Sequence, residues 1–567
     1  MKTRNIYKPA AFIAVLAVLF LFSGCNEGIN ENVPDYSGVD FKDPFGKYDP
    51  EIEVNMAAVL TDQIRKTALV GDITLEKNVW TDLIKEKLGI KIKYKWIANA
   101  DEWITKKNDE YNQRLNIAMA SGDLPDIMLV NPVQLKKLVD ADMVVEMQDY
   151  WDEYASPFTS ELYKAEGELP FKVMTVKGKL YGIPRLNDSY DGANCLIWYR
   201  KDWLEKLNLP EPKNMDELVE VIEAFSTQDP DGNGKRDTYG LGAIKDIVGA
   251  MGFNGIFNGY HAYPGIWVEG STGSLVYGSI QPEVKTALRE IRGLYEKGFI
   301  DKDFSIKGND GIAEDISEGK IGMIFGPMSM ALYPLQLNIL KDAEADWGCM
   351  KYVSSDDRPV MVSGKLGTTD GYAVRKGFEY PEVLVKLINI FMEKVYGPDA
   401  EFRKYGIGEE QLGNGSRQLT FLLSPVTTYP SGKNMRSYEL IKIALQTGDT
   451  SEMNSENLGQ YDSVLRYMKG IREEWGVAKL FSPDGAYKLL TEIKSNGELL
   501  LDKFIGAPTE TMAEKMGVLD DMQNEVFTRI IMGDQSLDSF DEFVRNWKML
   551  GGDRITKEVN EWYSQNR

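Results

Sequence analysis

Residues 120–130 of the chain read Ala-Ser-Gly-Asp-Leu-Pro-Asp-Ile-Met-Leu-Val, and this stretch decides the fold class. Residues 111–120 predict a helix, which the glycine and proline of the turn then end. The apolar run 127–130 has the length and composition of a buried strand. Asn131 and Pro132 next supply the N-cap and the first-turn proline of another helix. Helix and strand therefore alternate, as they do in an α/β domain.

The same alternation precedes this stretch of sequence. Residues 78–88 have one apolar helical face, and Gly89 is placed to end that helix in a left-handed conformation. Residues 90–96 then alternate apolar side chains with lysines, which is typical of a half-buried strand. Near the C-terminus, the serine and glutamate of 539–542 predict a capping box, and the glycine pair 551–552 should stop the helix that it begins.

Residues 1–24 have the pattern of a secretory signal peptide. Three basic residues precede the apolar run 10–22, which is shorter than the roughly 20 residues that a permanent membrane helix needs. The run leads into Leu21-Phe22-Ser23-Gly24-Cys25, which resembles a bacterial lipobox and implies a lipid on Cys25; a buried structural cysteine is the alternative. Residues 25–49 are rich in Asn, Asp, Gly and Pro and predict a flexible tether.

Charge and rare residues exclude several classes of function. The chain has 87 acidic and 65 basic residues, a net charge of −22, and no basic stripe, so nucleic acid is not an expected partner. Cys195 and Cys349 lie far from one another in sequence and from any histidine cluster, so zinc and redox sites are not expected, while their pairing stays open. His261 is the only histidine, which leaves triads and His-rich metal sites with one candidate.

Several strings together resemble bacterial extracellular solute-binding proteins of carbohydrate ABC importers. Residues 120–127 resemble the family signature, and three further strings follow in the order of that family. These strings are Gly178-Lys179-Leu180-Tyr181-Gly182-Ile183-Pro184, Trp198-Tyr199-Arg200-Lys201-Asp202-Trp203-Leu204 and Gly319-Lys320-Ile321-Gly322-Met323. The C-terminal strings 530–533 and 547–553 resemble the large lipoprotein branch, which includes LplA-type lipoproteins and alginate-binding proteins.

The resemblance implies an α/β, two-lobed, periplasmic-binding-protein-like fold with a hinge and a ligand cleft between the lobes. Lobe 1 is expected over 50–190 plus 354–373, and lobe 2 over 191–353 plus 374–567. The implied function is that of a monomeric, non-enzymatic subunit anchored by lipid outside the cell membrane. It would capture an oligo- or polysaccharide by closure of the lobes and deliver it to the transmembrane permease subunits of an ABC transporter.

Residues 229–237 place oxygen ligands at EF-hand spacing around a glycine that permits a tight turn. The predicted calcium ligands are Asp229, Asp231, Asn233, the carbonyl of Lys235, and Asp237. Position 12 is Gly240 where the EF-hand has a bidentate glutamate, but alginate-binding proteins carry a similar loop with calcium and no standard twelfth ligand. We therefore predict a structural Ca²⁺ ion; a solvated acidic turn is the alternative.

Sugar recognition needs aromatic faces for the C–H side of a pyranose, with amides and carboxylates for its hydroxyls. The best local match is the segment 254–267, whose glycines and asparagines predict a loop. The candidate ligand contacts are Trp267, Tyr263 and Asn254, with Tyr190 and Asp191 near the first lobe crossing and Asp370 near the third. A buried structural role is the alternative for Trp267. The sequence leaves open which sugar binds, with what length, linkage and charge.

Two other classes of function are compatible with parts of the sequence. Paired carboxylates alone can hydrolyse glycosides, so a secreted glycosidase or lyase is one alternative, although no motif selects a pair among the acidic residues. A surface lipoprotein that presents glycan to a sensor, or that acts as an adhesin, is the other. An enzyme would release products, and an adhesin would have no linked permease genes.

Overall fold

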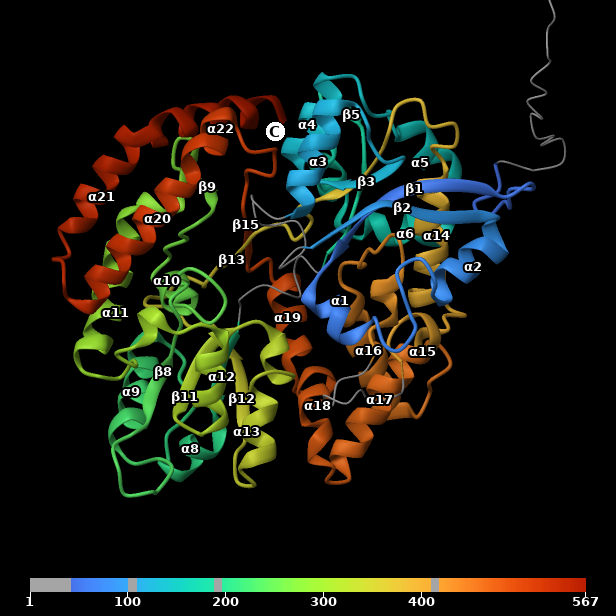
Figure 1. The fold of residues 1–567 in the computed structure, drawn as a ribbon. Helices are drawn as coiled ribbons and strands as arrows, with labels where there is room; N and C mark the ends of the chain where they lie inside the picture. The colour runs from blue at the N-terminus through green and yellow to red at the C-terminus, as the bar shows by residue number, and fades with distance from the viewer. Residues whose placement is uncertain (1–41, 100–109, 188–195, 409–417, 567) are drawn as a thin grey trace, which may run out of the picture.

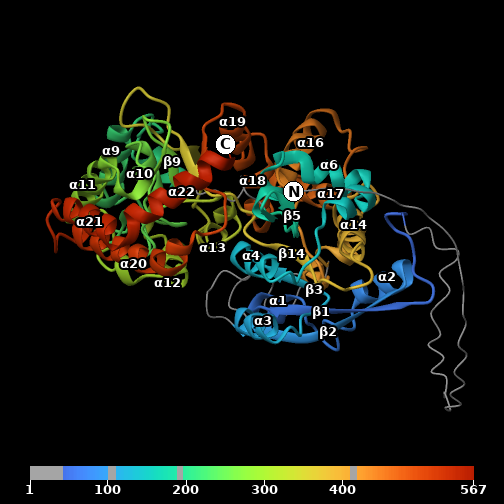
Figure 2. The ribbon, with the colours of Figure 1, turned by 90° about the horizontal axis from the view of Figure 1, so that it is seen from above.

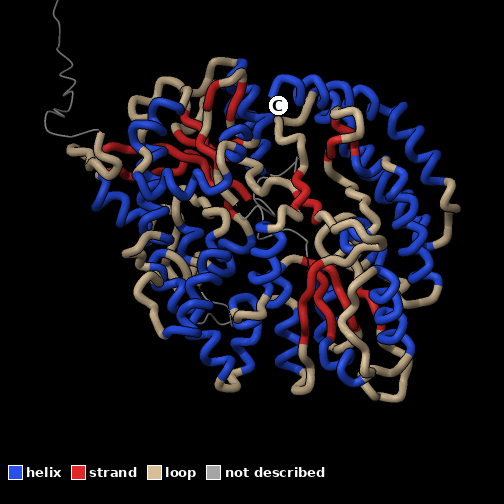
Figure 3. The backbone as a smooth tube through the Cα atoms, turned by 180° about the vertical axis from the view of Figure 1, so that it is seen from behind, coloured by secondary structure: helices blue, strands red, loops and turns tan. Residues whose placement is uncertain are grey.

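The chain folds into two lobes that lie side by side, each built around its own sheet (Figures 1 and 3). The computed structural model describes residues 42–99, 110–187, 196–408 and 418–566. Figure 2 shows the same two bodies from above, joined along one side. The predicted two-lobed α/β fold is confirmed. Several predicted features lie outside the described residues: the leader, Cys25, Tyr190, Asp191 and Cys195.

The two hydrophobic cores divide the chain at other points than the sequence predicted. The first core includes residues from 48–186 and from 366–426. The second core includes residues from 196–362 and from 435–559. The segment 374–426, which was predicted in lobe 2, therefore belongs to lobe 1. The chain crosses between the lobes three times, and the second and third crossings follow residues 362 and 426.

Helix α14 (Val383–Tyr396) explains why the predicted boundary was wrong. Most of its residues are buried, including Lys386 with 0% exposure, so the protein covers this helix on every side. The Lys386 ammonium donates to the carbonyl of Gly46 at 3.0 Å, and Tyr48 is also fully buried. Residues 42–49, the described end of the predicted tether, therefore pack against the first lobe.

The first lobe contains a five-stranded sheet in the order β2-β1-β3-β14-β6. Strand β1 pairs in parallel with β2 and β3, whereas β14 runs antiparallel to β3 and β6. The bounds are β1 (Ile52–Leu60), β2 (Ile90–Asn99), β3 (Ile127–Val130), β6 (Ile183–Pro184) and β14 (Gly371–Val374). Every residue of β3 and β14 is buried, as the apolar run at 127–130 predicted.

Capping residues set the helices around this sheet. Asn78 accepts two backbone N–H groups at the start of α2, and Gly89 ends that helix with φ of 66°. Asn131 accepts the backbone N–H of Gln134 at the start of α4, so these predicted boundaries are confirmed. Besides α14, the helices of this lobe are α1 (Asp62–Thr67), α2 (Val79–Leu88), α3 (Glu110–Ser121), α4 (Pro132–Asp140), α5 (Gln148–Tyr154), α6 (Pro157–Tyr163), α7 (Leu169–Val173) and α15 (Phe402–Tyr405).

The second lobe contains a four-stranded sheet in the order β12-β7-β11-β8. Strand β11 runs antiparallel to β7 and parallel to β8, and β12 is antiparallel to β7. The bounds are β7 (Leu196–Arg200), β8 (Tyr239–Gly242), β11 (Ile321–Gly326) and β12 (Trp347–Lys351). Cys349 of β12 is a free cysteine, and burial raises the pKa of its thiol to about 11.

The remaining helices contribute to the second core, and α17 also contacts α15 of the first lobe. They are α8 (Lys201–Lys206), α9 (Met215–Thr227), α10 (Asn254–Gly259), α11 (Pro282–Glu296), α12 (Asn309–Ser317), α13 (Leu335–Lys341), α16 (Lys433–Thr447), α17 (Ser455–Met468), α18 (Trp475–Phe481), α19 (Ala486–Ser495), α20 (Glu510–Met532), α21 (Ser539–Trp547) and α22 (Asp553–Asn566). Figure 1 shows α20, α21 and α22 along the outer side of this lobe. No helix within the described ranges is both long and apolar enough to cross a membrane.

The predicted capping box at 539–542 is wrong. Helix α21 takes Asp538 as its N-cap without a side-chain bond, and the Glu542 N–H bonds the Asp538 carbonyl. The glycine pair does not stop the helix either. Gly551 has φ of 141° and makes a kink, after which α22 continues. The kink is possible because glycine has no Cβ to clash in that conformation.

The segment 254–267 is only partly the predicted loop. Its first six residues form α10, because Ile256 and Phe257 are drawn into the second core with 0% exposure. Trp267 begins a short strand. Three small sheets complete the fold: β9 (Trp267–Glu269) antiparallel to β10 (Leu275–Tyr277), β13 (Val362–Gly364) parallel to β15 (Leu499–Leu501), and β4 (Thr175–Val176) antiparallel to β5 (Lys179–Leu180).

Candidate ligand-binding cleft

A cavity of about 1080 Å³ lies between the two lobes. The first lobe contributes the start of α4 and residues 366–370, and the second contributes residues 264–267, the segment after β15, and α20. Domain junctions are preferred places for ligand sites, and their volumes are typically about 300–1,000 Å³. The cavity is therefore large enough for an extended small molecule that touches both lobes.

One face of α20 forms a long wall of the cavity. Met512, Met516, Asp520 and Gln523 all line it. Their spacing of three or four residues places them on one side of a helix. The wall therefore changes from thioether groups near the start of α20 to polar groups further along it.

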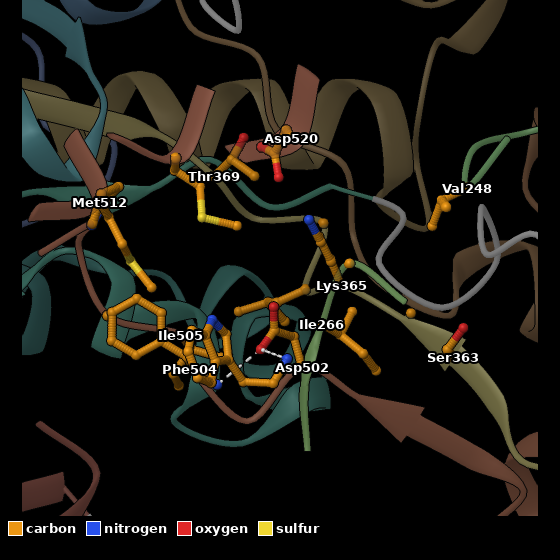
Figure 4. A pocket seen from close by; sticks show the side chains of 18 of the residues that line it. Val248, Ile266, Ser363, Lys365, Thr369, Asp502, Phe504, Ile505, Met512 and Asp520 are labelled. Atoms are coloured by element: carbon orange, nitrogen blue, oxygen red, sulfur yellow. Dashed lines mark hydrogen bonds between the residues drawn. The ribbon is translucent and has the colours of Figure 1, made fainter. Parts of the chain in front are cut away.

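The segment after β15 supplies the most accessible aromatic ring of the cavity. Trp267 and Tyr277 also line it but are each only 3% exposed, whereas Phe504 is half-buried. The Phe504 ring meets Trp562 edge to face, with centroids 4.9 Å apart. In Figure 4 Phe504 and Ile505 lie on the same side of the cavity as Met512. These residues form an apolar patch beside polar groups.

Asp502 stands beside this patch and is held by the backbone. Its Oδ1 accepts the N–H of Trp267 at 3.1 Å and the N–H of Phe504 at 3.0 Å (Figure 4). Burial raises the pKa of Asp502 to about 6, and the nearby Lys365 ammonium opposes that rise. Partial loss of solvent around the carboxyl group also raises the pKa of Asp520, again opposed by Lys365. The carboxylates are thus only partly compensated by the lysine.

Other polar groups that line the cavity have unused hydrogen-bonding capacity. The Thr368 hydroxyl and the Gln523 carbonyl oxygen are buried and have no partner among the described residues. Buried polar groups normally have partners, so such groups point to a missing water or ligand. Asn254 is 8% exposed and also lines the cavity. The cavity therefore offers donors and acceptors as well as an apolar surface.

The predicted ligand contacts are distributed unevenly around this cavity. Asn254, Trp267 and Asp370 line it, and Tyr263 is not among the lining residues. Trp267 belongs to the second core, where its ring packs against Tyr277 with centroids 5.1 Å apart. The structure therefore favours the buried structural role for Trp267, because so little of its ring is free to cover a sugar.

Asp370 lines the cavity, but its carboxylate already has a cationic partner. Arg185 Nε donates to Oδ1 and Arg185 Nη2 donates to Oδ2, each at 2.7 Å. Both side chains are largely buried, with exposures of 15% and 4%. A two-pronged pair of this kind fixes both groups in orientation. Asp370 therefore shapes the wall of the cavity between β6 and β14.

The sequence interpretation missed the residues from 502 onward. Asp502, Phe504 and the lining face of α20 lie far along the chain from the other cavity walls, and only the return of the chain after β15 brings them there. The sequence nevertheless contained a local indication of these binding residues. An aspartate and a phenylalanine precede Gly506 and Pro508 in a connection between strand and helix, which is the kind of loop that carries binding residues.

The acidic loop 229–237 lies outside the cavity, between α9 and β8. Asp229 Oδ2 accepts the N–H of Gly234 at 3.1 Å, while Asp229 Oδ1 is buried without a partner among the described residues. The Asn233 amide donates to Asp231 at 2.6 Å and to Asp237 at 3.1 Å. The predicted ligand side chains therefore gather in one turn.

This turn does not by itself show a metal centre. Within the described part of the chain, no three His, Cys, Asp or Glu side chains are arranged to hold an ion. The Lys206 ammonium also lies at the turn, where it donates to the carbonyl of Pro230 at 2.7 Å. The orphaned oxygen of Asp229 fits a cation ligand, since calcium prefers such hard oxygens. Calcium at 229–237 stays a prediction.

Two separately folded lobes around an amphipathic cavity define a binding protein of the periplasmic-receptor class. The family described as bacterial extracellular solute-binding protein matches residues 72–393. The chain belongs to this family, and the resemblance found in the sequence is confirmed.

Named relatives are similar over nearly the whole chain. The polygalacturonan/rhamnogalacturonan-binding protein YtcQ of Bacillus subtilis (strain 168) is 25% identical, over 99% of each chain. Lipoprotein LipO of the same organism is 26% identical, over 89% of this chain and 93% of its own. The EF-hand mutant of FusA, an S. pneumoniae ABC-transporter substrate-binding protein solved with fructo-nystose, has the same fold. Its TM-score is 0.58 at 15% identity, over 91% of this chain and 99% of that one.

Proposed function

We propose that this protein captures an oligo- or polysaccharide in the interlobe cavity and delivers it, unaltered, to the permease of an ABC importer. The observation that carries the proposal is the composition of the cavity, in which one accessible aromatic ring adjoins carboxylates and amides. The relatives are named as a polysaccharide-binding protein and an ABC-transporter substrate-binding protein, and these names support it.

The chemistry of a sugar ring fits these walls. A pyranose has a C–H face that packs on an aromatic or thioether surface and a rim of hydroxyls that donate to carboxylates and amide oxygens. Phe504 and Met512 would cover the first, while Asp520 and Gln523 would accept from the second. Asn254, which also lines the cavity, would add an amide. We therefore assign the stacking role to Phe504 in place of Trp267.

Closure of the lobes would couple capture to delivery. The lobes have separate cores and only three chain crossings between them, an arrangement suited to hinge motion. A ligand that contacts both walls binds the closed form more tightly and therefore shifts the population toward it. The permease would then distinguish the closed, loaded receptor from the open one.

The anchor is part of the same proposal. Cys25 follows small residues at the end of an apolar leader, and one relative is named a lipoprotein. Because one acyl chain holds a protein only weakly, a diacylglyceryl group on Cys25 would provide stable attachment at the outer side of the cell membrane. The mass of the intact membrane-extracted monomer tests this, and an unmodified N-terminus would contradict it.

A structural Ca²⁺ ion would be held by Asp229, Asp231, Asn233, Asp237 and the carbonyl of Lys235. The buried, partnerless Oδ1 of Asp229 supports this assignment, as does the EF-hand named in the FusA structure. The ion would supply positive charge to crowded carboxylates and fix the turn between α9 and β8. It has no part in ligand chemistry, because the turn lies outside the cavity.

A screen of the purified full chain against oligosaccharides tests the function. We expect a rise in melting temperature with at least one glycan, and we expect mass spectrometry to recover that glycan intact. Shortened glycan would instead identify a hydrolase or lyase that uses the cavity carboxylates. His261 offers no alternative catalytic base there, since it bonds Asp356 at 3.0 Å and does not line the cavity.

A further inference from the structure

The charged side chains that line the cavity are mostly acidic. Among the described lining residues they are four aspartates and one lysine. The aspartates are Asp246, Asp370, Asp502 and Asp520, and the lysine is Lys365. The whole chain is acidic as well, with a net charge of −22. An anionic ligand would therefore enter a region that is already rich in negative charge.

Asp370 does not contribute to the excess of negative charge in the cavity. Its carboxylate is matched by the guanidinium of Arg185 through two bonds of 2.7 Å. Three aspartates then remain against the single ammonium of Lys365. The cavity carries a formal excess of negative charge even after its best-formed ion pair has been removed.

Lys365 is the one cationic side chain among the cavity-lining residues that the structure describes, and its charge is already shared. It acts on Asp502 and on Asp520, where it opposes the effect of burial on the pKa of each carboxyl group. Figure 4 shows Lys365 reaching into the cavity, with Asp502 and Asp520 labelled around it. A ligand carboxylate drawn to this ammonium would come close to both aspartates and would be repelled by them.

We infer that the cavity selects uncharged oligosaccharides and discriminates against sugars that carry carboxylates, such as uronates. This inference rests on the proposed function and narrows its ligand class. Neutral hydroxyls donate to the three aspartates and meet no repulsion, whereas a uronate must overcome the excess of negative charge. The ligand class would thus differ from that in the name of the relative YtcQ, a polygalacturonan/rhamnogalacturonan-binding protein.

Calorimetry on the full chain tests the inference with matched ligands. One pair is a galacturonan trisaccharide in its fully methyl-esterified and its free-acid form, which share the same sugar backbone and differ in the charge and the ester methyl of each carboxyl group. Neutral fructo-, malto- and galacto-oligosaccharides complete the panel. We expect a neutral compound to bind most tightly, and we expect the acidic trisaccharide to bind at least about tenfold more weakly than the best neutral one. Any residual uronate binding should strengthen as salt rises, because salt screens repulsion.

Two variants show whether the cavity carboxylates cause the discrimination. Asp520→Asn removes a charge that lines the cavity, and it should narrow the gap between acidic and neutral ligands severalfold. Asp521→Asn makes the same chemical change at the next position of α20, which does not line the cavity, and should leave the gap unchanged. Both positions are exposed, so both variants should fold, and circular dichroism checks this.

The outcomes separate the two proposals. Uronates that bind as tightly as neutral glycans, or that bind better at low salt, would overturn the inference and leave the carbohydrate function intact. An equal effect of the two variants would also overturn it. If no glycan of either class bound, the proposed function would fail, and the inference would fail with it.

Discussion

Asp502 Oδ1 lies 3.1 Å from the backbone nitrogen of Trp267 and accepts its hydrogen bond. The Lys503 N–H returns a bond to the Trp267 carbonyl at 3.0 Å. These two bonds tie β9 to the segment after β15, although 235 residues separate the partners of the first bond in the chain. Two segments that are distant in sequence therefore form this wall of the cavity together, and the carboxylate of Asp502 is held in place without a ligand.

The fixed carboxylate should make stability depend on pH. Burial raises the pKa of Asp502 from 3.8 to about 6, so the folded protein holds this proton over a range where the unfolded chain has lost it. The contribution of Asp502 to the free energy of unfolding should then fall as pH rises from about 4 to about 6. Asp502→Asn removes the charge, while its amide oxygen can still accept both N–H groups.

Urea unfolding of the wild type and Asp502→Asn at several pH values checks this. At pH 7.5 the variant should be the more stable, by up to about 3 kcal/mol, and the difference should vanish near pH 4. The other titrating groups are the same in both proteins, so their effects on the free energy of unfolding cancel in the difference between the wild type and the variant. A difference that stays constant across the pH range would show that the charge of Asp502 is not buried.

Trp267→Ala should act on folding. The ring is 3% exposed within the second core, so its removal should lower the free energy of unfolding by roughly 3–5 kcal/mol. Denaturant titration measures this loss. The sequence interpretation expected Trp267 to stack on a sugar, and a well-folded variant with greatly weakened ligand binding would restore that interpretation.

Calcium should stabilise the loop 229–237. Because the ion binds the folded turn, saturating Ca²⁺ should raise the melting temperature, and an ion at 100 times its Kd adds about 2.7 kcal/mol. Asp231→Ala should abolish the rise. Asp357→Ala, at an exposed aspartate outside the loop, should retain it. A chelator that affects both variants equally, or that leaves the wild type unchanged, would exclude the site.

Local signals in the sequence predicted the fold well but only part of the site: Asn254, Trp267 and Asp370 line the cavity, whereas the residues from 502 onward were missed. Asn78 and Gly89 cap the two ends of α2 through hydrogen bonds to residues within about one turn of the helix, so the local sequence predicts them. The apolar run of β3 is buried as expected. The lobe boundary failed at α14 because only tertiary packing shows which core a largely buried helix enters. The role of Trp267 in ligand stacking stays a prediction, and the burial of its ring in the second core favours the structural alternative. A loop-like composition carries no information about the segment after β15 that covers this ring.

Phe504 makes the central claim directly testable, because it is the accessible ring in a cavity that we propose binds sugar. The measurement is calorimetric titration of the best glycan into the wild type, Phe504→Ala and the control Phe45→Ala, whose ring is 37% exposed and does not line the cavity. We expect Phe504→Ala to bind about ten- to a hundredfold more weakly and Phe45→Ala to bind like the wild type. Equal affinities for all three folded proteins would contradict binding in the interlobe cavity.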